Sequence, residues 1–259
     1  MTVNPYLVGR VAVQLILVNG PTPDLTFSPV EDLAVRTATN VAFGTVGAFA
    51  KANTPPIKLQ FGLAVEVVTL VAAQTYAALP RQGTDFNERE AVWQDSALTS
   101  LGQPSGATGL LALAAAGRGG ADHSFVMLVS KYNLAWQAYA RPERATVYVD
   151  WNWLLDTTRA DKGWGPLKAD RVIAHEIGHI FRAPDEFRGS GTPAACSVLS
   201  ATGTGYGQLD FPNFNCEATN PAPVTCLMRS PDHTTLCPAT RAHWGWVDGN
   251  GDGIPDVLQ

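Results

Sequence analysis

His175, Glu176 and His179 have the residue types and spacing of a catalytic metal site. Two histidines four positions apart on an α-helix differ by only about 40° around its axis, so both imidazoles can reach one ion. Imidazole nitrogens bind zinc readily, and a catalytic zinc site keeps one position open for water. Glu176 would lie beside that face, where its carboxylate can accept a proton from the water without binding the metal. The spacing therefore predicts a helix that carries catalytic zinc.

The third protein ligand is expected from the chain that follows this helix. Pro184 disfavours the helical conformation of the residue before it and cannot donate to the helix ladder, so the chain should turn there. A turn would swing an acidic side chain back toward the metal. Asp185, six residues after His179, is the expected ligand, and Glu186 beside it is the alternative.

The run from His175 to Asp185 resembles the zinc motif of the metzincin peptidases, His-Glu-x-x-His-x-x-Gly-x-x-His or Asp. It departs from that motif at Arg182, where the family has a glycine. The family glycine lies in the turn, where a positive φ is easy for a residue that has no Cβ. An arginine in a left-handed conformation costs about 1–2 kcal/mol. Either the chain accepts this strain or its turn has a different shape.

Met228 extends the resemblance, because metzincins carry a methionine in a tight turn beneath the metal, although most methionines simply fill gaps in a core. The resemblance implies a secreted zinc endopeptidase acting on proteins or peptides. In it, His175, His179 and Asp185 hold the zinc ion, and Glu176 is the general base.

Two other functions remain open. One is a metal-dependent hydrolase of a non-peptide substrate, and the other is an extracellular binding or adhesion module with a vestigial zinc site.

The four cysteines all follow the metal-binding run and lie in the last quarter of the chain. None has the C-x-x-C spacing of a structural zinc site. The segment between them is rich in Gly, Pro, Thr and Asn, so disulfides would tie down loops that form little core. We expect the pairs Cys196–Cys216 and Cys226–Cys237, with four buried free thiols as the alternative. Disulfides indicate an oxidising compartment, so the protein is expected outside the cell or at its surface.

Composition describes a folded chain with little attraction to nucleic acid. Hydrophobic residues make up 46% and charged residues 16%, and the net charge is −5 without a basic cluster. No apolar run reaches the roughly eighteen residues that would cross a membrane. The apolar run 11–18 contains Gln14 and is typical of a buried strand, so any signal peptide is expected outside this sequence. We expect a monomer, or one part of a longer multidomain chain.

Hydrophobic periodicity predicts an α+β fold whose N-terminal subdomain is α/β-like. Strands are expected at 8–19, 58–71, 123–129, 146–151 and 135–140. Helices are expected at 29–51, 86–101, 108–116, from 166 or 167 through the metal-binding run, and at 238–246. The metzincin resemblance implies a mixed twisted sheet, an active-site helix and a loop-rich C-terminal subdomain tied by disulfides. The catalytic domain would span 1–247, divided into subdomains 1–182 and 183–247, and 248–259 would be a tail or linker.

The tail alternates oxygen-bearing residues with glycine, which is a pattern suited to a hard cation such as calcium. Asp248, Asn250, Asp252 and Asp256 supply the oxygens. The pattern resembles the calcium loops of dockerin-like and thrombospondin type 3 repeats. Position twelve of such a loop would be Gln259 in place of a bidentate glutamate, so binding would be weak. A polar, disordered end is the alternative.

Overall fold

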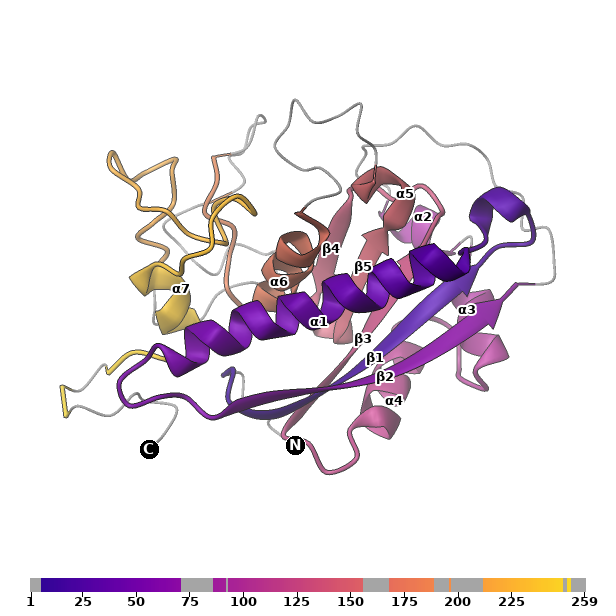
Figure 1. Cartoon of the computed structure of the whole chain (residues 1–259), viewed down its shortest axis with the longest axis horizontal. Helices are drawn as coiled ribbons and strands as arrows, with labels where there is room; N and C mark the ends of the chain where they lie inside the picture. Colours follow the sequence, from indigo (N-terminus) through magenta and orange to yellow (C-terminus); the bar gives the residue numbers. More distant parts are fainter. Residues whose placement is uncertain are drawn as a thin grey trace.

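A five-stranded sheet forms the centre of the molecule, with the strand order β2-β1-β3-β5-β4. The computed structural model describes residues 6–70, 86–91, 93–155, 168–188, 196, 212–248 and 251–252. The strands are β1 (Gly9–Asn19), β2 (Leu59–Thr69), β3 (His123–Ser130), β4 (Ala138–Arg141) and β5 (Thr146–Asp150). Strands β2, β1, β3 and β5 run parallel, whereas β4 pairs antiparallel with β5 at one edge (Figure 1). The prediction of a mixed sheet is confirmed.

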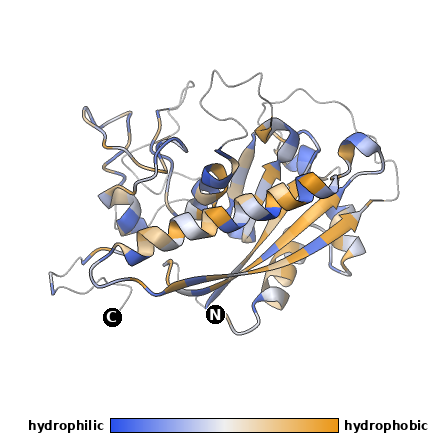
Figure 2. Cartoon of the chain, viewed as in Figure 1, coloured by the Kyte–Doolittle hydropathy of each residue, from blue (hydrophilic) through white to orange (hydrophobic). Residues whose placement is uncertain are grey.

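Strand β1 is central because both of its faces are apolar, as expected for a parallel strand covered on both sides. Val13 and Leu15 belong to a core cluster shared with α1 (Pro29–Lys51) and α6 (Ala169–Ile180). Ile16 and Val18 point to the opposite face and pack with α3 (Gln94–Ser100) and α4 (Gly106–Gly117). The sheet therefore lies between two helical layers, and its strands are largely hydrophobic (Figure 2).

Helix α1 begins where its capping residues predict. Ser28 accepts a hydrogen bond from the backbone of Glu31, and the Glu31 carboxylate accepts one from the Ser28 backbone N–H at 2.8 Å, which completes a capping box. The helix packs against α6 on the same face of the sheet (Figure 1). It therefore helps to fix the helix that carries the metal-binding run.

The single helix predicted at 86–101 is wrong in one respect, because the structure has two helices, α2 (Phe86–Ala91) and α3. Trp93 lies between them with a non-helical φ of −134°. Its indole is fully buried and packs against the rings of Tyr132 and Tyr148, with centroids 6.1 and 6.3 Å away. Core packing of this large side chain overrides the local helical pattern.

The C-terminal region contributes little regular structure in the described residues. It contains α7 (Pro238–His243), and α5 (Trp151–Leu154) precedes the metal-binding helix. Two short 3-10 helices, Pro23–Leu25 and Pro142–Arg144, complete the elements. Trp246 anchors the region to the N-terminal segment by donating from Nε1 to the Leu7 carbonyl at 2.6 Å. Within the described ranges, we find no helix with the length and apolar character needed to cross a bilayer.

Candidate metal centre

Helix α6 presents His175 and His179 on its buried inner face, and each is 2–3% exposed. His175 Nδ1 lies 2.9 Å from the carbonyl oxygen of Leu227, and His179 Nδ1 lies 2.7 Å from that of Ala183. A carbonyl oxygen only accepts hydrogen bonds, so we infer that each Nδ1 carries a proton. In the neutral imidazoles both Nε2 atoms then present lone pairs, which is the form that binds a metal.

Asp185 completes a close triangle of ligand atoms with these histidines. Its Oδ1 lies 3.1 Å from His175 Nε2 and 3.2 Å from His179 Nε2, and the two Nε2 atoms are 3.1 Å apart. Zinc bonds of about 2.0–2.1 Å in tetrahedral geometry place neighbouring ligand atoms about 3.3 Å apart. The triangle has nearly this size. A divalent cation fits this arrangement.

In the turn after α6, Arg182 adopts the strained left-handed conformation, which was one of the two alternatives for this position, with a φ of +70°. The N–H of Arg182 donates to the His179 carbonyl at 2.9 Å, and the N–H of Ala183 donates to the Gly178 carbonyl at 3.0 Å. This pair of bonds is a Schellman motif, which ends a helix through one left-handed residue. Pro184 then prevents continuation. The turn thus brings Asp185 back to the histidines.

The charge state of Asp185 suits a metal ligand. Burial favours the neutral acid, but the adjacent His179 and His175 outweigh it through charge and hydrogen bonds. They hold the pKa of Asp185 well below its usual range. Asn213 fixes the backbone at this position, because its Nδ2 donates to the Asp185 carbonyl at 2.8 Å. The carboxylate is therefore ionised at neutral pH.

Glu176 lies next to the triangle without belonging to it. The side chain is 3% exposed, and burial raises its pKa to about 8. The backbone N–H of Ala140 in β4 donates to this carboxylate. No described residue bonds to Glu176 Oε2, which is buried. A positive ion at the triangle would lower this pKa again. The geometry provides a carboxylate oxygen available for proton transfer.

Met228 packs directly beneath α6. Gly178 makes the contact possible, because a Cβ at this position would lie 2.6 Å from Met228 Sδ and 3.2 Å from the Trp244 ring. The preceding residue, Leu227, supplies the carbonyl that orients His175. The segment 226–228 therefore supports α6 by packing and by a hydrogen bond. The role of Gly178 could not be predicted from the sequence, because nothing local distinguishes it from any other motif position.

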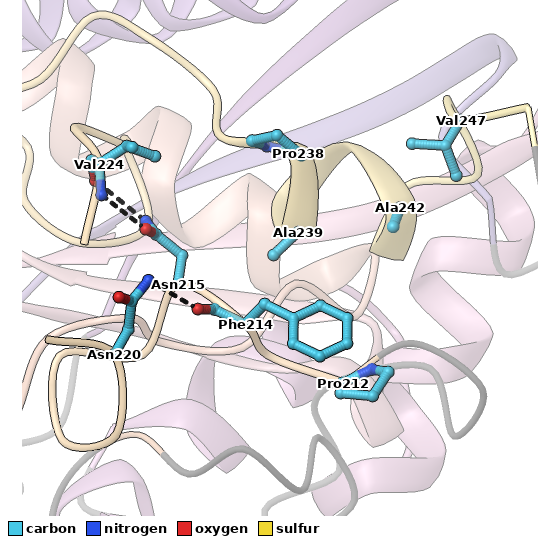
Figure 3. A pocket seen from close by; sticks show the side chains of 9 residues that line it. All are labelled: Pro212, Phe214, Asn215, Asn220, Val224, Pro238, Ala239, Ala242 and Val247. Carbon is cyan, nitrogen blue, oxygen red and sulfur yellow. Dashed lines mark hydrogen bonds between the residues drawn. The ribbon is translucent and has the colours of Figure 1, made fainter. Parts of the chain in front are cut away.

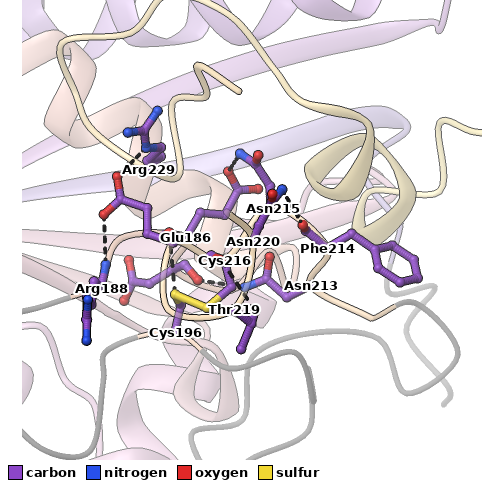
Figure 4. The surroundings of a disulfide bond; sticks show 12 residues. Glu186, Arg188, Cys196, Asn213, Phe214, Asn215, Cys216, Thr219, Asn220 and Arg229 are labelled. Atoms are coloured by element: carbon purple, nitrogen blue, oxygen red, sulfur yellow. Dashed lines mark hydrogen bonds and ion pairs between the residues drawn. A yellow bond between two sulfur atoms is a disulfide. The ribbon is translucent and has the colours of Figure 1, made fainter. Parts of the chain in front are cut away.

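The cysteines follow the predicted pairing only in part. Cys196 and Cys216 form a disulfide with Cα atoms 5.5 Å apart (Figure 4), as expected. The expected Cys226–Cys237 disulfide is wrong for this structure, where both are buried free thiols. The two cysteines are neighbours, since the Cys237 N–H donates to Cys226 Sγ at 3.3 Å, but both sulfurs also contact polar groups. Cys237 Sγ donates to Glu186 Oε1 at 2.8 Å, and Cys226 Sγ lies 3.2 Å from Thr240 Oγ1.

Glu186, the alternative third ligand, points away from the histidines. Its carboxylate groups instead with the thiols of Cys226 and Cys237, with the ligand atoms all within 4.8 Å of one another. Burial holds the pKa of the Cys226 thiol well above its usual value, so this sulfur keeps its proton. Thr240 Oγ1 also donates to Glu186 Oε1, at 2.7 Å. Hydrogen bonds therefore link the atoms of this second cluster.

An apolar pocket in the C-terminal region is lined by none of the predicted site residues (Figure 3). Its lining residues are Pro212, Phe214, Asn215, Asn220, Val224, Pro238, Ala239, Ala242 and Val247. Asn215 connects the pocket wall to the buried Glu186, because its Nδ2 donates to Glu186 Oε2 at 2.6 Å. Asn213 and Asn215 support the third-ligand segment, and no local sequence signal marks them.

The predicted calcium loop is described only in part. Asp248 Oδ1 accepts from the backbone N–H groups of Gly251 at 2.7 Å and Asp252 at 3.0 Å, which forms a tight turn. Asn250 and Asp256 lie outside the described residues. Calcium binding by the tail stays a prediction.

Comparison with known proteins does not assign the candidate metal centre to a family. No protein-family model matches the chain, and a search of curated proteins also finds no match.

Proposed function

We propose that the chain is a secreted, zinc-dependent endopeptidase whose zinc ion is held by His175, His179 and Asp185. The observation that carries the proposal is the ligand triangle, in which His175 Nε2, His179 Nε2 and Asp185 Oδ1 lie 3.1–3.2 Å from one another. Glu176 strengthens the argument, because its buried Oε2 has no hydrogen-bond partner among the described residues. Metal ligands beside such a carboxylate are suited to hydrolysis.

Each protein residue of the proposed site has a separate role in the reaction. When bound, zinc supplies Lewis acidity, which makes a water more acidic and polarises a carbonyl group. Glu176 accepts a proton from the attacking water and returns it to the leaving amine. The carbonyls of Leu227 and Ala183 keep the imidazoles in the required tautomer. Glu176, the second residue of the motif, therefore acts first as a base and then as an acid.

The position of β4 favours an extended peptide as the substrate. This strand is at the edge of the sheet and uses one side to pair with β5. The N–H of Ala140 on β4 reaches the Glu176 carboxylate, so the strand borders the site directly. An extended peptide that adds to a strand edge is bound through its main chain, independently of its side chains. Such binding would place a peptide bond next to Glu176.

Substitution of the general base tests the proposal. Glu176→Gln keeps the shape of the side chain but removes its basicity. We expect peptide hydrolysis to fall by about 10²–10⁴-fold while bound zinc stays at the wild-type level. Glu143→Gln is the control, because this carboxylate is exposed in the 3-10 helix 142–144 and lies 3.8 Å from Arg141 and Arg144. It should hydrolyse peptides normally.

The measurement pairs a peptide library with small esters and amides, and metal content is determined on the same samples. Cleavage of the small compounds alone would replace the proposal with a non-peptide hydrolase. Zinc binding without turnover of any substrate would indicate a binding module.

A further inference from the structure

Glu186 carries a fully buried carboxylate for which the described residues supply no cationic partner. Its donors are neutral: Thr240 and Cys237 at Oε1, and Asn215 at Oε2. Burying an ionised carboxylate is costly unless its lone pairs are satisfied by hydrogen bonds. The three donors come from two segments of the C-terminal region, and they hold the carboxylate in one orientation.

The backbone at Glu186 is also fixed on both sides. Its N–H donates to the Met228 carbonyl at 2.9 Å, and its carbonyl accepts from the Glu217 N–H at 2.9 Å. The preceding carbonyl, that of Asp185, accepts from Asn213. The segment that carries Asp185 is thereby fastened to the Met228 turn and to residues 213–217. Figure 4 shows Glu186 beside Asn213 and Asn215. Asp185 has little freedom beyond its own side-chain torsions.

We propose that Glu186 is a positioning residue, which holds Asp185 at the distance from His175 and His179 that zinc requires. The inference rests on the proposed function, since it takes the ligand triangle as a zinc site. Groups that orient metal ligands commonly contribute 10- to 100-fold to metal affinity. Glu186 acts through the chain to its neighbour and makes no contact with the ion.

The test compares zinc affinity in three variants of the full chain, measured by competition with a chelating dye. Glu186→Gln replaces one carboxylate oxygen by an NH2 group, which can no longer accept from Asn215 or from Thr240 and Cys237, and should weaken zinc binding by about 10–100-fold. Thr240→Val removes one donor from the same carboxylate at nearly constant volume and should weaken binding by a smaller factor. Glu143→Gln is the control, because its exposed carboxylate lies 3.8 Å from Arg141 and Arg144 and contacts neither this segment nor the Met228 turn.

Cobalt substitution provides a readout that a merely structural role would not change. The visible spectrum of Co²⁺ reports ligand geometry, so Glu186→Gln should alter it while circular dichroism remains that of the wild type. Glu143→Gln should keep both the spectrum and an affinity within about twofold of the wild type. If Glu186→Gln does not fold, the Thr240→Val result decides.

Two results would overturn the inference. The first is wild-type zinc affinity and an unchanged cobalt spectrum in Glu186→Gln or Thr240→Val. The second is a thiolate charge-transfer band in cobalt-loaded wild type, which would place the ion at Cys226 and Cys237. Failure of the wild type to bind zinc at all would instead remove the proposed function, so the two failures are distinguishable.

Discussion

Two buried clusters lie on either side of the Asp185–Glu186 peptide, and they differ in how their lone pairs are satisfied. In the first, the Nε2 atoms of two imidazoles and Asp185 Oδ1 lie 3.1–3.2 Å from one another. In the second, Glu186 accepts hydrogen bonds from a thiol, a hydroxyl and an amide. The lone pairs of the Glu186 carboxylate are therefore satisfied by donors within the protein, whereas two Nε2 atoms and a carboxylate oxygen converge in the first cluster. Proximity of potential ligands alone does not identify a metal site, because hydrogen-bond donors can satisfy them equally well.

Lowering the pH tests the region of the second cluster, and it has the largest expected effect on the free energy of unfolding. His243 lies in α7, the helix whose N-terminal turn supplies Cys237 and Thr240 to the second cluster. Burial lowers the pKa of His243 to about 4, below its ordinary value of about 6.5. The unfolded chain therefore binds a proton between these pH values that the folded chain does not. Stability present above pH ~6.5 should fall by about 3 kcal/mol as the pH drops to ~4.

Urea unfolding of the chelator-treated protein across this pH range measures the loss without interference from metal release. The variant His243→Asn should show a shallower dependence on pH by about the same amount. An identical pH dependence in both proteins would contradict the assignment.

A larger side chain at Gly178 tests the contact between the Met228 turn and the helix that carries His175 and His179. Gly178→Ala places a methyl group 2.6 Å from Met228 Sδ, so the Met228 side chain or the helix must shift. We expect a destabilisation of about 1–3 kcal/mol, together with weaker zinc binding. Gly44→Ala in α1 meets no atom within 4 Å and should instead stabilise the protein by about 0.5–1 kcal/mol. Thermal unfolding and zinc titration distinguish the two, and equal effects would show that Gly178 has no special role.

The features predicted correctly from sequence are local. The spacing of His175 and His179, the capping residues of α1 and the continuous apolar run of β1 each express a rule that operates within one element. The turn at Pro184 is also encoded within a few residues, including the strain that Arg182 accepts. Local chemistry was therefore enough to anticipate the ligand triangle.

The features predicted wrongly depend on contacts that are distant in sequence. The thiol of Cys237 bonds to Glu186, 51 residues earlier, so the spacing of the cysteines could not reveal that Cys237 has another partner. The break between α2 and α3 follows from packing of Trp93 against Tyr132 and Tyr148, which belong to another part of the chain. The supporting roles of Asn213 and Gly178 have the same origin.

Metal content of protein purified without chelator tests the central claim most directly. The account predicts one zinc ion per chain in the wild type and in Cys237→Ser, and a loss of affinity of about a thousandfold, or ~4 kcal/mol, in His179→Ala. Absence of zinc from the wild type would contradict the account. So would its retention in His179→Ala with loss from Cys237→Ser, because the second cluster would then be the metal site.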